Sequence, residues 1–239
     1  PLDIQSAIYL NKCVDYFKIA SGDNNYLQLI KKVLSFKKPI IISTGLLGDL
    51  EIADLIKLIK KNHFPMKKVF FLHCVSDYPV KDNEANLTSI KYLKDKFKIN
   101  IGYSDHTLGI EASINAVAYG AQIIEKHFTI NKNYSNFRDH KLSADPIEMM
   151  KLVKSVRRSS IMVGKYEKKI SKGEKKNLKL MRRSFYAKVQ INKGEKITIN
   201  KIKYVRPFNH LSSTKIENIL NKKAKSLIKK SHPIFIKNT

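Results

Sequence analysis

Five short apolar runs, each followed by an amphipathic helical stretch, constrain the fold of this chain more than any other feature. The runs lie at residues 16–20, 39–44, 68–74, 99–104 and 121–128. They are apolar on both faces, as strands buried inside a parallel sheet are. The stretches between them repeat apolar residues every three to four positions, as at Ile52, Leu55, Ile56 and Ile59. This alternation predicts an α/β fold with right-handed crossovers.

The polar residues that end these runs favour a barrel over an open doubly wound sheet, although five β–α units fit both. No G-x-G-x-x-G follows a predicted strand, which weakens the dinucleotide-binding version of the open sheet. Polar residues stand at the carboxyl end of every run: Ser21, Asp23, Ser43, Thr44, His73, Ser104, Asp105, His106 and His127. A TIM-barrel enzyme has its active site on that face. We therefore expect residues 1–163 to form the last five β–α units of a TIM barrel, with about three leading units outside this chain.

The character of the sequence changes near residue 164. Residues 164–182 are lysine-rich and are expected to form a linker. Short β-like segments at 184–191, 195–199 and 202–207, separated by NKG and NK turns, predict a small β-rich domain over 183–239. No glycine follows Gly194, so Asn209 and Asn221 are the residues expected to take left-handed turn positions there.

The formal net charge of +26 raises the question of an anionic partner. Only six of the 46 basic residues are arginine, and the lysines are spread over nearly every predicted helix and loop. No recognition motif accompanies them, so we expect no nucleic-acid partner, and a lysine-rich nucleic-acid binder is kept as an alternative. No apolar run reaches the roughly 18 residues of a membrane span. Two cysteines, Cys13 and Cys74, make no disulfide framework, and we expect a cytoplasmic protein without a membrane partner.

The strand ends also carry a resemblance to a known family. "FKIASGD", "ISTG", "LHCVSDYP", "GYSDHT", "EKHFT" and "DHKLSADP" follow one another, and this ordered set resembles the sialic acid synthase family. "RRSFYAKVQINKGEKIT" is similar to the C-terminal SAF, or antifreeze-like, domain of that family, which has a β-clip fold. The resemblance implies a transferase that condenses phosphoenolpyruvate with an N-acetylated amino sugar, such as N-acetylmannosamine. Its products would be a nine-carbon sialic-type acid and phosphate.

The resemblance implies that His106 and His127 are catalytic and hold a divalent metal, with Mn²⁺ expected and Mg²⁺ or Co²⁺ as alternatives. The chemistry of the two positions agrees with this, because the tips of neighbouring parallel strands lie about 4.8 Å apart and converge. Two neutral imidazoles would leave several coordination positions open for water and a sugar oxygen.

The family's other ligands can be carried onto matching positions. The residues that would bind phosphoenolpyruvate are Lys18, Ser21, Ser43, Ser76 and Ser104. A lysine serves a phosphate as a point charge, and hydroxyl groups complete its hydrogen bonds. The residues that would bind the sugar are Asp23, Tyr78, Asp139 and Arg206. The resemblance implies a domain-swapped homodimer, in which Arg206 of one chain enters the active site of the other. His73 is expected to be a hydrogen-bonding wall residue and Cys74 a buried apolar thiol.

Three questions stay open at this point. The sugar could be N-acetylmannosamine, a bacillosamine-derived sugar that leads to legionaminic acid, or the precursor of pseudaminic acid. The family's first strands carry a catalytic glutamate and further phosphate ligands, so the activity of this chain alone is undecided. A non-catalytic remnant that acts only through its SAF domain is therefore the alternative to an enzyme.

Overall fold

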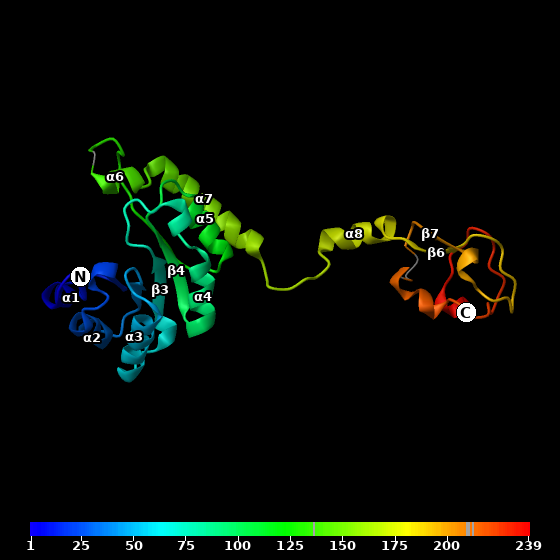
Figure 1. The fold of residues 1–239 in the computed structure, drawn as a ribbon, viewed down its shortest axis with the longest axis horizontal. Helices are drawn as coiled ribbons and strands as arrows, with labels where there is room; N and C mark the ends of the chain where they lie inside the picture. The colour runs from blue at the N-terminus through cyan, green and yellow to red at the C-terminus, as the bar shows by residue number, and fades with distance from the viewer. Residues whose placement is uncertain (136, 209–210, 212) are drawn as a thin grey trace. The chain divides into compact units, whose positions relative to one another are not determined.

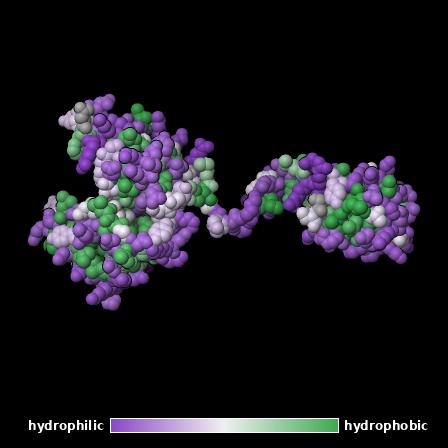
Figure 2. Space-filling view, viewed as in Figure 1, coloured by the Kyte–Doolittle hydropathy of each residue, from purple (hydrophilic) through white to green (hydrophobic). Residues whose placement is uncertain are grey.

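The computed structural model describes residues 1–135, 137–208, 211 and 213–239. The chain divides into two compact units, Pro1–Lys165 and Tyr166–Thr239 (Figure 1). Hydrophilic residues cover much of the visible surface of each unit, with apolar residues scattered between them (Figure 2). Within the described residues, no helix combines the length and the hydropathy needed to cross a membrane.

Five parallel strands form the sheet of the first unit. They are β1 (Phe17–Ile19), β2 (Ile40–Ser43), β3 (Val69–Cys74), β4 (Asn100–Asp105) and β5 (Ile124–Lys126). The strands pair in the order in which they follow along the chain, from β1 to β5. A doubly wound sheet reverses its strand order at a switch point, whereas a barrel wall does not. The unreversed order and the curl of the sheet make this unit a parallel half-barrel (Figure 1), as the sequence predicts.

One helix precedes β1, others follow the strands, and together they cover one face of the sheet. They are α1 (Ile4–Leu10), α2 (Leu27–Ser35), α3 (Asp49–Lys61), α4 (Thr88–Phe97), α5 (Glu111–Ala118) and α7 (Pro146–Val163), with the short α6 (Arg138–Leu142) in the loop after β5. The apolar stripe predicted on α3 is buried as expected. Alternate strand residues such as Phe17, Ile42 and Phe71 pack into the core beneath these helices. The opposite face of the strand ends is left for polar side chains.

β5 is shorter than the predicted strand at 121–128. Its three residues pair only with β4 in the described sheet. Upstream of it, the Gln122 N–H donates to the Ile101 carbonyl at 2.8 Å and the Ile123 carbonyl accepts from the Tyr103 N–H at 2.9 Å. The hydrogen bonding to β4 therefore begins before the regular strand does.

The second unit contains the helix α8 (Lys172–Met181) and an antiparallel pair, β6 (Ser184–Ala187) and β7 (Ile202–Val205). Its own core is built from Phe185, Ala187, Ile191, Ile197, Ile202, Leu211, Ile219, Ala224, Ile228 and Ile234. Most of this unit is irregular, and its segments are joined by isolated bridges rather than ladders.

The structure adds a helix to one segment predicted for this part of the chain and contradicts one predicted strand. The segment 164–182, expected to be a linker, contains α8, because Ser171 and Glu174 form a capping box at its start. Residues 195–199 form no strand; Lys196 makes one isolated bridge with Lys223. Asn221 takes the expected left-handed conformation, with a φ of 62°, and Asn209 lies outside the described residues.

Candidate active site

The carboxyl ends of the five strands bring most of the predicted site residues of the first unit together. The register pairs Cys74 with Ser104 and Ser104 with Glu125, so these side chains share the face of the sheet opposite to α5. His106 and His127 follow two residues after Ser104 and Glu125 and continue this face. The predicted convergence at the strand ends is therefore present in the fold.

A lysine, a glutamate and a serine form the charged part of this cluster. Glu125 Oε1 accepts a hydrogen bond from Ser104 Oγ at 2.7 Å and lies 3.4 Å from Lys18 Nζ. The Lys18 ammonium also donates to the Ile19 carbonyl at 3.2 Å. The Lys18 and Glu125 side chains are 28% and 40% exposed, so a small anionic ligand can reach the ammonium.

Sequence reasoning missed Glu125. The signal that could have found it is its position in "EKHFT", two residues before His127. Residues two apart on a strand point to the same face. Any lining side chain assigned at 127 therefore implies that residue 125 lines the same face.

Two serine hydroxyls meet above Gly45. A Cβ on Gly45 would lie 2.2 Å from Ser76 Oγ and 2.6 Å from Ser21 Oγ, so the missing side chain leaves room for both. The Ser43 and Ser76 oxygens are buried and have no hydrogen-bond partner among the described residues. Buried polar atoms are rarely left unpaired without a reason. The hydroxyls of Ser43 and Ser76 are therefore donors available to a bound ligand.

The two predicted metal-binding histidines lie beside each other. The ring centroids of His106 and His127 are 5.1 Å apart and their planes cross at 78°. The Tyr78 ring lies 4.3 Å from the His106 ring and 5.8 Å from the His127 ring. His106 Nδ1 lies 2.8 Å from the Val75 carbonyl. Because a carbonyl can only accept, Nδ1 carries the hydrogen, and in the neutral ring Nε2 keeps its lone pair.

The surroundings move the pKa values of the two histidines in opposite directions. Burial lowers the pKa of His127, and the neighbouring His106 lowers it further. Burial would also lower the pKa of His106, but hydrogen bonding to the Cys74 thiol and the Val75 carbonyl outweighs it, and the net shift is upward. A neutral His127 is the form that can bind a metal.

Cys74 is buried, as predicted, but its surroundings are not apolar. Its Sγ lies 3.8 Å from His106 Nδ1 and 3.5 Å from Ser21 Oγ. Burial raises the pKa of the thiol, and hydrogen bonding to His106 and Ser21 more than offsets this, so the pKa is lowered. The prediction of an apolar thiol is wrong, because strand alternation places Cys74 on the face that carries the polar residues.

The histidine pair supplies part of a ligand set for a divalent metal. Over the described residues, no group of three or more His, Cys, Asp or Glu side chains is arranged to hold a metal. The hydrogen bond from His106 to a backbone carbonyl is the outer contact that typically orients a metal-binding imidazole. Two imidazoles fit such a metal, with its remaining ligands supplied from elsewhere, and the metal stays a prediction.

The predicted sugar-binding residues are not all in one place. The Arg138 guanidinium carbon lies 5.0 Å from the Tyr78 ring centroid, and Arg138 Nε lies 3.8 Å from Asp139 Oδ1. Asp139 Oδ1 is buried without a hydrogen bond among the described residues. Asp23 ends the turn that begins at Ser21. Sequence reasoning missed Arg138, which adjoins Asp139 in a loop without regular spacing.

Arg206 and His73 lie outside this cluster. Arg206 belongs to the second unit, where its Nε donates to the Met181 carbonyl at 2.6 Å. His73 points to the helix-covered face: its Nε2 lies 2.9 Å from the Ala85 carbonyl and its ring stacks on Tyr103 at 5.8 Å. It makes a hydrogen bond, as expected, but at the outer side of the sheet.

Comparison with known proteins gives a consistent result. Residues 1–168 match the model of the NeuB family, and residues 182–237 match that of the SAF domain. The chain is 41% identical, over 93% of its length, to N,N'-diacetyllegionaminic acid synthase of Campylobacter jejuni, of which the match covers 66%. It is 37% identical, over 89% of its length, to pseudaminic acid synthase of the same species, of which the match covers 61%.

A solved structure agrees with these relatives. The crystal structure of N-acetylneuraminic acid synthetase from Leptospira borgpetersenii, in complex with citrate, matches with a TM-score of 0.69 and 35% identity. The match covers 74% of this chain and 61% of that one. The chain thus spans less than two thirds of the length of these relatives. Because the family model covers most of the chain and a SAF domain follows it, the chain belongs to the NeuB family of acid synthases.

Proposed function

We propose that this chain forms the phosphoenolpyruvate and aldehyde sites of a synthase that joins phosphoenolpyruvate to an N-acetylated amino sugar. The observation that carries the proposal is the cluster at the strand ends. It combines a reachable ammonium at Lys18, a carboxylate at Glu125 and unpaired hydroxyls at Ser43 and Ser76. The names of the three relatives reported above, which are synthases of sialic-type acids, support the same chemistry.

Phosphoenolpyruvate carries two anionic groups, and the cluster has donors for both. The Lys18 ammonium serves as a point charge, and the hydroxyls of Ser21, Ser43, Ser76 and Ser104 complete the hydrogen bonds. Ser43 and Ser76 lose nothing when a ligand arrives, because their oxygens have no hydrogen bond to give up among the described residues. Binding therefore replaces an unfavourable arrangement with a paired one.

The reaction forms one carbon–carbon bond and breaks one carbon–oxygen bond. The methylene carbon of phosphoenolpyruvate attacks the aldehyde carbon of the open-chain sugar, and the aldehyde oxygen takes a proton. Water adds to the cationic carbon that results, and Glu125 accepts one of its protons, which balances the proton taken up by the aldehyde oxygen. The remaining proton of the new hydroxyl goes to the phosphate, which leaves with the oxygen that joined it to that carbon. A ketone remains, and positioning and electrostatics supply most of the acceleration.

His106 and His127 would hold a divalent metal, with Mn²⁺ proposed and Mg²⁺ or Co²⁺ as alternatives. When bound, such a metal supplies a Lewis acid for the aldehyde oxygen. The hydrogen bond from His106 Nδ1 to the Val75 carbonyl fixes the imidazole tautomer. The low pKa of His127 keeps its ring neutral and ready to bind.

The sugar would lie against the loop after β5 and the Tyr78 ring. Asp139 accepts from sugar hydroxyl or amide groups, and Asp23 does so from the β1 side. In the same proposal, Arg206 reaches the sugar from the partner chain of a domain-swapped homodimer. Its exposure on the second unit leaves it accessible to such a site.

Release of phosphate from phosphoenolpyruvate tests the function. We expect Mn²⁺-dependent release with N-acetylmannosamine or with one of the diacetylated sugars that lead to legionaminic and pseudaminic acids. His127→Ala should abolish the metal-dependent rate. A folded chain that neither releases phosphate with any of the three sugars nor binds phosphoenolpyruvate would contradict the proposal and favour a non-catalytic remnant.

Complementation between two inactive variants tests the swapped dimer. Co-expressed His127→Ala and Arg206→Ala chains form some mixed dimers, and each mixed dimer has one site with both residues intact. We expect activity in the mixture and none in either variant alone. If both variants are inactive and the mixture stays inactive, Arg206 does not act across a dimer.

A further inference from the structure

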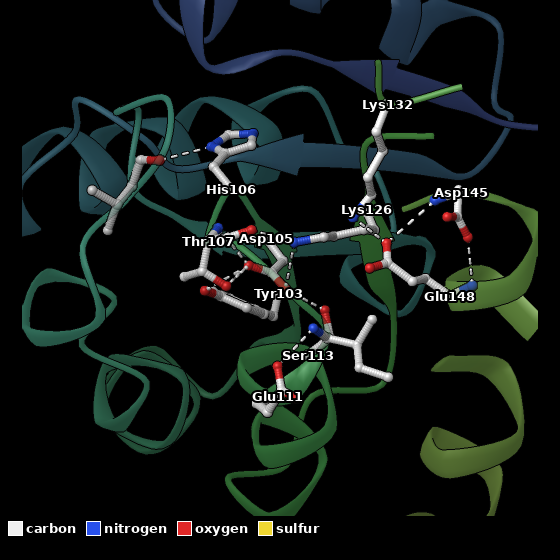
Figure 3. A network of polar contacts seen from close by, with 12 residues as sticks. Tyr103, Asp105, His106, Thr107, Glu111, Ser113, Lys126, Lys132, Asp145 and Glu148 are labelled. Carbon is white, nitrogen blue, oxygen red and sulfur yellow. Dashed lines mark hydrogen bonds and ion pairs between the residues drawn. The ribbon is translucent and has the colours of Figure 1, made fainter. Parts of the chain in front are cut away.

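A buried ion pair is formed by the residues that directly precede the two histidines, Asp105 and Lys126, on the side of the sheet that α5 covers (Figure 3). Lys126 Nζ lies 3.2 Å from Asp105 Oδ2, and the two side chains are 2% and 0% exposed. The sequence places Asp105 among the polar strand ends expected on the active-site face, but strand alternation turns its side chain to the helix-covered face. The question is why two charges are kept inside the protein at this place.

Five donors surround the Asp105 carboxylate. Oδ1 accepts from the Thr107 N–H and Oγ1, both at 2.8 Å, and from the Tyr103 hydroxyl at 3.4 Å. Oδ2 accepts from Ser113 Oγ on α5 at 2.6 Å, in addition to the Lys126 ammonium. Lys126 also donates to the Thr107 carbonyl at 2.5 Å. A carboxylate is the acceptor-only group that suits this set of donors.

Strand alternation connects this pair to the active site. Asp105 stands between Ser104 and His106, and Lys126 stands between Glu125 and His127. The register places Asp105 opposite Lys126 and Ser104 opposite Glu125. A slip of one residue would turn every side chain of β5 to the other face of the sheet. The ion pair therefore holds the register that places Glu125 beside Ser104 and His127 beside His106.

β5 needs such a tie, because its ladder to β4 is only three residues long. Beyond the strand, the His127 carbonyl accepts from the Ala144 N–H at 2.7 Å. Lys132 pairs with Glu148 at the start of α7 (Figure 3). Those contacts secure the loop after β5, whereas two side-chain contacts join the tips of β4 and β5. The Asp105–Lys126 pair does so on the face that α5 covers, and the Ser104–Glu125 hydrogen bond does so on the opposite face.

The energetics favour a positional role over a stabilising one. Two buried charges lose their hydration, and an ion pair of this kind often gives no more stability than apolar residues of similar volume. The pair instead specifies one geometry of the strand tips, because its hydrogen bonds form in one arrangement only. A pair that is costly to bury and points in one direction is suited to fixing the geometry of its neighbours.

We infer that Asp105 and Lys126 are positioning residues that hold His106 against His127 and Ser104 against Glu125. Their consequence for turnover rests on the proposed function, whereas their effect on the ring geometry does not. Asp105→Asn should disturb this geometry, because the new amide N–H₂ would face either the donors at Oδ1 or those at Oδ2.

Three variants and one control test the inference in the full chain. Asp105→Asn breaks the pair, and the double variant Asp105→Leu with Lys126→Met replaces both charges with apolar groups of similar size. Lys126→Arg keeps the charge of the pair. It should therefore disturb the ring geometry less than Asp105→Asn does. The matched control is Asp95→Asn, which breaks the exposed Lys91–Asp95 pair on α4.

The first readout is independent of activity. In metal-free protein labelled at histidine, the 5.1 Å ring contact predicts a nuclear Overhauser effect between His106 and His127. We expect it to vanish in Asp105→Asn and in the double variant and to persist in the control. The second readout is Mn²⁺ affinity, expected to fall about 10- to 100-fold. The third is kinetic: kcat should fall about 100-fold while the KM for phosphoenolpyruvate changes little.

The outcomes separate the two ideas. If the wild type neither binds Mn²⁺ nor turns over, the proposed function fails, and the ring contact still tests the positioning role. If the folded double variant keeps the ring contact, the inference is overturned. Loss of the fold in the double variant would also overturn it, because the pair would then serve the stability of the barrel rather than the geometry of the histidines.

Discussion

At the scale of single residues, the site is organised around groups that the fold leaves unpaired. Ser43 and Ser76 bury hydroxyl oxygens that find no partner among the described residues, and Lys18 shares its charge with a partly exposed glutamate. An unpaired buried polar group costs about 1–3 kcal/mol. Such costs are tolerated at functional sites, where a bound ligand supplies the missing hydrogen bonds.

Removing one of these hydroxyls should separate stability from binding. We expect Ser43→Ala to keep or raise the free energy of unfolding and to weaken phosphoenolpyruvate binding about tenfold. Ser184, whose buried hydroxyl donates to the Leu211 carbonyl at 2.7 Å, provides the opposite case, and Ser184→Ala should lower stability by about 1 kcal/mol. Urea unfolding measures the free energy of unfolding of each variant, and calorimetric titration measures its affinity for phosphoenolpyruvate. A Ser43→Ala chain that binds normally and unfolds more easily would contradict this view.

His73 should make the first unit sensitive to acid. Burial lowers its pKa below the usual value of 6.5, so below that value the unfolded chain takes up a proton more readily than the folded chain. Stability contributed by the neutral ring is therefore lost as the pH falls below about 6.5, by at most about 1.4 kcal/mol per pH unit. His73→Gln removes the titration, and its amide can still donate to the Ala85 carbonyl.

The free energy of unfolding, measured from pH 7.5 to 5, checks this. The wild-type curve should fall more steeply than the curve of the His73→Gln chain. Parallel curves would mean that the buried ring does not govern the acid response.

At the scale of elements, regular patterns were predictable from the sequence and local exceptions were not. The apolar spacing of residues 52–59 gives the buried face of α3 directly. The strands of the parallel sheet are found where apolar runs end in polar residues, although β5 spans only Ile124–Lys126 of the predicted 121–128. Arg138 depends on the path of an irregular loop, and no periodicity predicts such a path.

The lysine-rich composition of residues 164–182 does not predict a helix, but the capping box at the start of α8 does. The helix buries none of its residues. Its start is fixed by Ser171 and Glu174, and its last turn accepts hydrogen bonds from the Phe208 N–H and Arg206 Nε. We expect Ser171→Ala to cost the helix about 1 kcal/mol. Faster hydrogen exchange of the α8 amides, with unchanged exchange in β6, would show it. Equal exchange in the variant and the wild type would mean that the cap is not what forms the helix.

At the scale of the whole molecule, each unit has a core of its own. The cores of Pro1–Lys165 and Tyr166–Thr239 share no residue. Lysines at 165, 168 and 169 are exposed in the segment between the units. Brief trypsin treatment should therefore cut there first and yield two pieces that keep their secondary structure by circular dichroism. Early cleavage inside either core would contradict this division.

The barrel prediction could be made before any coordinates because polar residues end every apolar run, and a TIM barrel has its active site at that end of the strands. The unreversed strand order in the structure then confirms the choice over a doubly wound sheet. The orientation of single side chains required the register. His73, one position from Cys74, lies on the opposite face, and Glu125 is recognised only once β5 is set beside Ser104.

The alternation at the strand tips has a consequence for how such an enzyme can change over evolution. At 104–106 and 125–127, residues that face the reaction are interleaved with residues that belong to the buried ion pair. A mutation at any of these positions therefore changes either the candidate site on one face or the buried ion pair on the other. Tyr78 and Arg138 lie outside these strand tips and contact each other. For the proposed synthase, new sugar preferences should therefore arise by substitution in the segments that carry Tyr78 and Arg138, and random libraries at the strand tips should yield mostly inactive chains.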